Sequence, residues 1–430
     1  WLNNDKGFQL DGRNIDVKAK AVHARGGFRY LQPANDEPWL GILAGISTDD
    51  GSQAWRYFPE NLMGKDLVDY LSGAIQGGEA DNATLVYGGN PQLFPYKHNE
   101  GQFEVLVPLR NAKFAFQPDW PALTNLDIEL DFINDGLWMK TDGVNLGGVR
   151  ASNLTAVIPD YSKEKLLIDA DIKGPGKAVG PYFDETPLKD SLGATLQELQ
   201  LDGDVNARLH LDIPLNGELV TAKGEVTLRN NSLFIKPLDS TLKNLSGKFS
   251  FINGDLQSEP LTASWFNQPL NVDFSTKEGA KAYQVAVNLN GNWQPAKTGV
   301  LPVAVNEALS GSVAWDGKVG IDLPYHAGAT YNVELNGDLK NVSSHLPSPL
   351  AKPAGEPLAV NVKVDGNLNS FELTGQAGAD NHFNSRWLLG QKLTLDRAIW
   401  AADSKTLPPL PEQSGVELNM PPMNGAEWLA

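Results

Sequence analysis

The chain of 430 residues contains no cysteine. Without thiols it can form neither a disulfide scaffold, nor a catalytic thiol, nor a zinc site with cysteine ligands. Basic residues are also scarce, because 35 Lys and Arg stand against 52 Asp and Glu, which gives a formal net charge of −17. A nucleic-acid-binding protein needs a basic stripe to displace counterions from phosphate. The composition therefore disfavours nucleic acid as a partner.

Long apolar runs and familiar catalytic motifs are missing as well. No stretch approaches the roughly 18 apolar residues that span a bilayer. The sequence has no G-x-S-x-G, no G-x-x-x-x-G-K, and no G-x-G-x-x-G after a strand pattern. Its six histidines stand alone, without His-x-His or His-Glu-x-x-His spacing. The sequence therefore predicts no catalytic residue, no metal site and no cofactor.

Glycine and proline are plentiful by contrast. The 42 Gly and 28 Pro make up about 16% of the chain, against a usual share of about 12%. This excess favours many short strands and turns over long helices. The length suggests about three domains at roughly 150 residues each, and an apolar share of 41% is enough for a packed interior.

The dominant local pattern is alternation with period two, which is typical of strands with one apolar face. In the stretch 126–132 every second residue is apolar, and the residues between are acidic. The sequence therefore predicts a mainly β fold with antiparallel neighbours. Runs with similar alternation cover 103–109, 166–172, 205–213, 283–289, 319–323, 331–335, 358–364 and 371–373.

Two further patterns predict how these strands are connected. Asx-Gly pairs tolerate the backbone of tight hairpins, so each pair is interpreted as a turn. Apolar residues recur at helical spacing in 59–75 and 187–199, which predicts two short amphipathic helices. The Asx-Gly pairs are Asp202-Gly203, Asn216-Gly217, Asn253-Gly254, Asn290-Gly291, Asp316-Gly317, Asn336-Gly337 and Asp365-Gly366.

An internal repeat organises the chain. Leu109-Arg110-Asn111 recurs as Leu228-Arg229-Asn230, and Phe132-Ile133-Asn134 recurs at the same offset as Phe251-Ile252-Asn253. A helix followed by several strands thus occurs twice. The predicted organisation is a β segment at 1–58 that completes a preceding repeat, helix-plus-meander repeats at 59–180 and 181–300, and a degraded third repeat at 301–430 with proline-rich linkers at 347–357 and 407–413.

The apolar face of the strands has two interpretations. It packs against a second sheet in an ordinary sandwich, or the sheet curls into a groove whose apolar lining stays open to hydrocarbon. The gapless repeat favours an elongated, curled sheet. A carbohydrate-active enzyme is a further alternative, which the eleven tryptophans keep open, and it would need clustered carboxylates in a cleft.

Several longer stretches of the chain resemble those of a known protein family. Among them are Phe116-Gln117-Pro118-Asp119-Trp120-Pro121 and Ser344-His345-Leu346-Pro347-Ser348-Pro349, and the others lie in 64–71, 81–86, 101–105 and 424–430. Through these stretches the chain resembles the YhdP proteins of the AsmA-like superfamily along essentially its whole length. The resemblance implies an interior piece that lacks the family's amino-terminal membrane anchor and its carboxy-terminal portion.

The resemblance also implies a function. It suggests a large periplasmic protein, anchored in the inner membrane of a Gram-negative bacterium, whose sheet folds into a taco-like groove that carries phospholipid towards the outer membrane. No enzymatic activity is expected. The implied partners are phospholipid acyl chains, the inner membrane through the absent anchor, and other envelope proteins. The alternative is a non-catalytic envelope scaffold or binding module with a closed β core, which predicts a protein partner and no bound lipid.

The lining of such a groove is expected on the apolar side of each strand. Each acyl CH₂ removed from water is worth about 0.8 kcal/mol, so a continuous apolar lining can offset extraction from a bilayer. The candidates for lipid contact are Phe103, Val105, Val107, Ile128, Leu130, Phe132, Ile168, Leu209, Leu211, Val285, Val287, Leu289, Val333, Leu335, Val360 and Val362.

Overall fold

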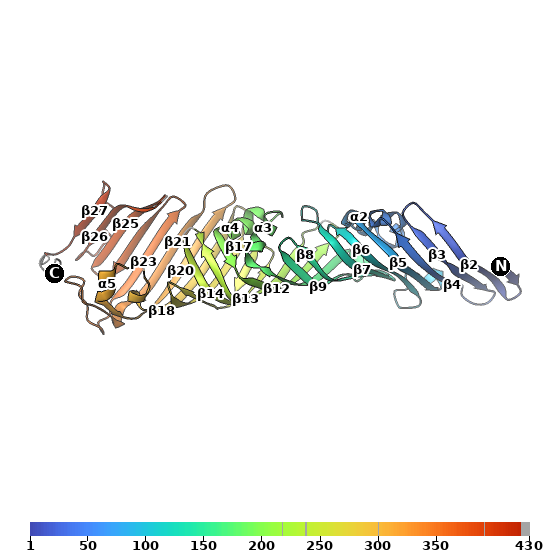
Figure 1. Cartoon of the computed structure of the whole chain (residues 1–430), viewed down its shortest axis with the longest axis horizontal. Coiled ribbons are helices and arrows are strands. Elements are labelled where there is room, and N and C mark those ends of the chain that lie inside the picture. Colours follow the sequence, from blue (N-terminus) through green and yellow to red (C-terminus); the bar gives the residue numbers. More distant parts are fainter. Residues whose placement is uncertain (217, 237–238, 300, 391, 423–430) are drawn as a thin grey trace. The chain divides into compact units, whose positions relative to one another are not determined.

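The computed structural model describes residues 1–422 apart from 217, 237–238, 300 and 391. Strands dominate it, and the helices are short (Figure 1). The mainly β class is therefore confirmed. The stretch 424–430 of the family resemblance and Gly217 of one Asx-Gly pair lie outside the described residues.

Contacts divide the chain into two compact units. Unit 1 comprises Trp1–Pro187 and Asn206–Glu225, and unit 2 comprises Leu188–Val205 and Val226–Ala430. The predicted boundaries at 58, 180 and 300 are not tested by this division and stay a prediction.

The sheet of unit 1 is a meander in which each strand from β1 to β10 pairs antiparallel with the next strand along the chain. β12 follows as a second neighbour of β10. The strands are β1 (Leu2–Asn4), β2 (Gly7–Lys18), β3 (His23–Pro33), β4 (Trp39–Thr48), β5 (Ile75–Gly89), β6 (Gln102–Phe114), β7 (Leu123–Ile133), β8 (Gly136–Leu146), β9 (Val149–Ile158), β10 (Lys165–Pro175) and β12 (Asp204–Pro214).

In unit 2, β14 pairs with β15 and β16, and the sheet then runs antiparallel through β17, β18, β20, β21, β23, β24, β25 and β26. β27 is parallel to β26, which is an exception to the predicted antiparallel order. β11 pairs with β13, and β19 with β22. The strands are β11 (Leu199–Asp202), β13 (Thr221–Ile235), β14 (Ser240–Ile252), β15 (Asp255–Ser258), β16 (Leu261–Trp265), β17 (Gln268–Glu278), β18 (Ala282–Trp293), β19 (Leu309–Gly311), β20 (Val313–Pro324), β21 (Thr330–Asp338), β22 (Val342–Ser344), β23 (Ala359–Asn367), β24 (Ser370–Ala377), β25 (Asn381–Leu389), β26 (Leu393–Ala401) and β27 (Gly415–Asn419).

The register of unit 1 is interrupted by β-bulges. Between β6 and β7 it shifts beside Asn111 and Asn125, whose φ angles are 50° and 52°. In unit 2 Asn230 and Asn244, each 119 residues further on, have φ angles of 55° and 54°. These shared conformations support the predicted repeat. From β17 to β25, by contrast, the register is constant.

Most Asx-Gly pairs are not turns, which corrects the sequence prediction. Asn253-Gly254 does form the hairpin between β14 and β15. Four other pairs lie inside strands, where the glycine leaves room for a large neighbour. A Cβ at Gly366, for example, would meet Tyr331 and Phe371. The pairs inside strands are Asn290-Gly291, Asp316-Gly317, Asn336-Gly337 and Asp365-Gly366.

The predicted helices form in modified shape. The stretch 59–75 forms two helices, α1 (Glu60–Met63) and α2 (Lys65–Ala74), which are separated by Gly64 at a φ of +82°. A 3₁₀ turn, η1 (Gly51–Tyr57), precedes this stretch. The stretch 187–199 gives a π-helical turn at Lys189–Gly193 and then α4 (Ala194–Glu198). The remaining helices are α3 (Val179–Phe183) and α5 (Val303–Ala308). None of the helices in the described part of the chain has the length and apolarity that a bilayer crossing needs.

Candidate functional site: the apolar face

An apolar face runs without interruption across the regular strands of unit 2. Residues directly opposite each other in an antiparallel pair point to the same side of the sheet, so the pairing defines rows across this face. One row joins Val272, Leu289, Gly317, Leu335, Val362, Gly375 and Phe383. The next row joins Phe274, Val287, Val319, Val333, Val364, Leu373 and Ser385.

The lining candidates on this face of unit 2 are only partly covered. Val285 and Leu289 are buried. The other five are half-buried, and none of them belongs to the large cluster of buried apolar side chains, which lies in unit 1. These five are Val287, Val333, Leu335, Val360 and Val362.

The lining candidates of unit 1 are covered more completely. Ile128, Leu130, Phe132 and Ile168 are buried in one apolar cluster. Val105, Val107 and Leu211 are half-buried and pack against that cluster, and Phe103 and Leu209 are half-buried.

Helices α1 and α2 provide much of that cover. Met63, Leu67 and Leu71 belong to the same cluster as the buried strand residues, and Leu67 and Leu71 are fully buried. Just before α1, the ring of Phe58 lies 6.0 Å from that of Phe132. Sequence periodicity predicts an amphipathic helix here, but it gives no signal for the surface that the helix covers.

The opposite face of unit 2 is polar. Amides form hydrogen bonds from strand to strand: Asn271 Nδ2 donates to Asn290 Oδ1 at 3.0 Å, and Asn361 Nδ2 donates to Asn336 Oδ1 at 2.7 Å. Lys363 and Glu334 form an ion pair at 3.6 Å on the same side. The sheet thus separates an apolar side from a hydrated side, as the alternation predicts.

Tyr283 places a hydroxyl group beside the apolar lining of β18, and this hydroxyl is paired. Its Oη donates to Gly254 O at 2.8 Å and lies 2.8 Å from Thr276 Oγ1. Burial raises the pKa of Tyr283 to about 12, so the phenol stays neutral. The side chain therefore adds no charge to this face.

Tryptophans gather at one end of the same strands. The rings of Trp293 and Trp315 meet edge to face with centroids 4.7 Å apart, and Trp265 and Trp293 meet at 6.3 Å. Trp293 Nε1 donates to Pro269 O at 2.6 Å. Because these rings pack against one another, they do not form the flat stacking platform that a sugar-binding cleft needs.

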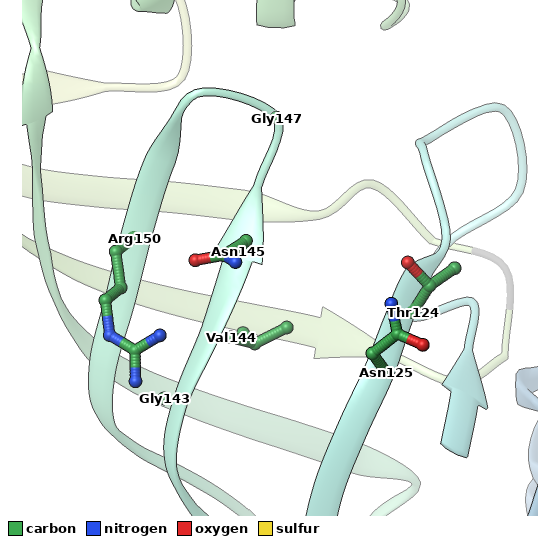
Figure 2. A pocket seen from close by; sticks show the side chains of 7 residues that line it. All are labelled: Thr124, Asn125, Gly143, Val144, Asn145, Gly147 and Arg150. Carbon is green, nitrogen blue, oxygen red and sulfur yellow. The ribbon is translucent and has the colours of Figure 1, made fainter. Parts of the chain in front are cut away.

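A hollow in unit 1 lies on the polar side, where β7, β8 and β9 meet (Figure 2). Its lining comprises Thr124, Asn125, Gly143, Val144, Asn145, Gly147 and Arg150 and holds no carboxylate. The Arg150 guanidinium occupies the space that a Cβ at Gly143 would take. Within the described residues, no three histidine or acidic side chains come together as metal ligands. The apolar face is therefore the candidate site.

Comparisons with known proteins identify the family of the chain. A family model described as the YhdP protein matches residues 1–430. The chain is 99% identical over 430 residues to a protein of Escherichia coli (strain K12) named "Intermembrane phospholipid transporter YhdP". The match covers all of this chain and 34% of that protein, so the chain spans about a third of the relative's length. No solved structure matches the chain.

Proposed function

Because the chain belongs to the YhdP family, we propose that it is a segment of a lipid conduit that carries phospholipid between the inner and outer membranes along the apolar face of its sheets. The relative's name, an intermembrane phospholipid transporter rather than an enzyme, supports this role. The proposal includes a periplasmic location, an inner-membrane anchor in the longer protein, and contacts with other envelope proteins. An intermembrane role supports the cell envelope as the location.

The observation that carries the proposal is the row pattern of unit 2. Val287 on β18, Val319 on β20 and Val333 on β21 follow one another across neighbouring strands and keep part of their surface open. Each CH₂ of an acyl chain that covers such surface gains about 0.8 kcal/mol. The gain is similar along this row because Val287, Val319, Val333 and Val364 are all valines. A chain that slides along it therefore meets no deep trap, which suits transport better than storage.

A closed scaffold is the competing function, and the buried cluster of unit 1 favours it for that unit. A closed core binds no lipid, whereas a conduit retains lipid through purification. The two functions therefore differ in what an organic extract of the protein contains.

The test is to purify the chain from the bacterial periplasm under mild conditions and identify extracted lipids by mass spectrometry. We expect stoichiometric phospholipid. Val287→Asp places a charge on the apolar face and should remove most of the lipid. Ala286→Asp is the matched control, since Ala286 is exposed on the opposite face of the same strand, between Ser275 and Gly320.

Circular dichroism melts of both variants show whether each is folded. A folded Val287→Asp chain with unchanged lipid content would refute the lining assignment. A folded, lipid-free parent chain would instead favour the scaffold.

A further inference from the structure

The apolar face across β6–β10 is occupied by the chain's own side chains. Met63, Leu67, Val68 and Leu71 of α1 and α2 join the strand residues in one buried cluster. Val107, which packs against this cluster, lies opposite Leu130 on β7. The strand face that stays half open in unit 2 is thus covered more completely in unit 1, in part by a helical segment inserted between β4 and β5.

The contacts that hold this segment down are almost entirely apolar. Within the described residues, one side-chain hydrogen bond joins α2 to the segment that follows β6, from Tyr70 Oη to Phe116 O at 3.1 Å, and Ala115 N donates to Ala74 O at the end of α2 at 2.8 Å. The ion pair of α2 runs from Lys65 to Asp69 within the helix and does not involve the sheet. Apolar contacts have no preferred direction, so an acyl chain can replace them without leaving buried polar groups unpaired.

The segment also has a pivot. Gly64 separates α1 from α2 at a φ of +82°, and a Cβ placed there would meet no atom within 4 Å. No side chain caps the start of either helix, because Pro59 and Gly64 hold the two N-cap positions without a side-chain hydrogen bond. A change of backbone angle at this junction therefore breaks no side-chain cap, although it breaks the hydrogen bond that Gly64 N donates to Glu60 O at the end of α1.

We propose that α1 and α2 occupy an acyl-chain site of unit 1 in place of lipid, and that they swing away to uncover Val107, Leu130 and Phe132 when phospholipid arrives. This inference rests on the proposed function. It distinguishes the apolar face of unit 2, which is open without lipid on β18–β23, from the apolar face of unit 1, which opens only when an acyl chain displaces the helices. A phospholipid brings two acyl chains, which offer more apolar surface than the helical side chains that they replace.

Photo-crosslinking tests the division directly. The photoreactive amino acid p-benzoylphenylalanine is placed at Val107, which packs against the cluster that the helices share, or at Val333, on the open stretch. The chain is then incubated with phosphatidylethanolamine vesicles and irradiated. We expect lipid adducts at position 333 in the parent chain and few at 107. Leu71→Ala removes a fully buried contact of α2 and should raise the adducts at 107 by about tenfold or more, while those at 333 stay the same.

Leu242→Ala is the matched control, because Leu242 is a buried leucine of β14 outside the helical segment. It should leave adducts at 107 unchanged. If adducts form at 333 but Leu71→Ala does not raise those at 107, the helices are a permanent core and the inference is wrong. If neither position gives adducts, the proposed function itself fails.

Hydrogen exchange is a second test of helix displacement, and it needs no substitution. We expect lipid vesicles to speed exchange of the backbone amides of 65–74 several-fold, since displaced helices lose protection. Unchanged or slower exchange in lipid-loaded protein would overturn the inference.

Discussion

In the described part of the chain, six asparagines inside strands have φ angles between 49° and 55°. A side chain at such an angle is strained, and asparagine tolerates it better than other residues with a Cβ. Asn111, Asn125 and Asn153 stand where the register shifts, so they form the bulges that bend and twist the strands. The local bending of these strands is thus encoded partly at single residues. The six are Asn14, Asn111, Asn125, Asn153, Asn230 and Asn244.

The energetic cost of this backbone strain can be measured at Asn125. Asn125→Ala should lower the free energy of unfolding by about 1 kcal/mol, because alanine has no favourable interaction at a φ of 52°. Asn125→Gly should stay within about 0.5 kcal/mol of the parent. Urea unfolding followed by circular dichroism gives both values. Asn332→Ala, at an exposed position on β21 without a positive φ, is the control. Equal stability of the alanine and glycine variants would contradict the strain argument.

Tyr283 predicts an alkaline loss of stability. Its pKa is about 12 in the folded chain against 10.0 for the model phenol, so the folded state holds the proton over a range in which the unfolded state releases it. The stabilisation is complete below about pH 10 and is lost as the pH rises towards about 12. Urea midpoints measured across this range should fall more steeply for the parent than for Tyr283→Phe.

Tyr283→Phe should also change the stability of the chain near neutral pH. Tyr283→Phe removes the donor to Gly254 O and should cost about 1–2 kcal/mol at pH 8. Parallel slopes for the parent and the variant above pH 10 would show that Tyr283 does not account for the alkaline loss.

At the scale of strands, large side chains on the apolar face are accommodated by glycines opposite them. Gly375 on β24 lies opposite Phe383 on β25, and the Phe383 ring covers it. Gly366 lies opposite both Tyr331 and Phe371. The pairs of Gly366 explain why Asp365-Gly366, which the sequence predicts as a turn, lies inside a strand.

Gly375→Ala tests this pairing. A Cβ there would overlap Phe383 Cζ, so the ring must leave its position, and we expect a loss of about 1–3 kcal/mol. The near-ultraviolet circular dichroism of the chain should change as well. Gly45→Ala on β4 is the control, because no atom lies within 4 Å of the added Cβ. A Gly375→Ala chain as stable as the control would show that the ring does not need the glycine.

Strands could be predicted from the sequence, but their surroundings could not. Period-two alternation depends on neighbours two residues apart, so it locates β7 and β18 and assigns the apolar side of each. What covers that side depends on residues far apart in the sequence, such as Leu71 of α2 and Leu130 of β7, which share one buried cluster, and no local pattern contains this information. The parallel pairing of β27 with β26 is equally invisible, since it depends on the path of 402–414.

The whole molecule carries a net charge of −17, which affects lipid choice more than fold. Anionic headgroups are repelled by such a surface, and raising salt from about 0.01 M to about 0.15 M shortens the Debye length from about 30 Å to about 8 Å. Uptake of phosphatidylglycerol from vesicles should therefore rise with salt. Uptake of zwitterionic phosphatidylethanolamine should change little, because its tails supply the binding energy.

Lipid transfer assays at the two salt concentrations measure how the uptake of each lipid changes with salt. A fall in phosphatidylglycerol uptake with added salt would point instead to attraction between the protein and the headgroup.

The division of the chain into units has a consequence for its biosynthesis. Unit 1 receives Asn206–Glu225 only after Leu188–Val205 of unit 2 has been made, and β12, which pairs with β10, belongs mostly to that late piece. A ribosome that stalls between these points leaves the edge of β10 without its neighbour. Bare strand edges recruit strands from other chains. The nascent chain is thus most prone to aggregation during a short window of translation, which synonymous codon changes around 188–225 would lengthen or shorten without altering the mature protein.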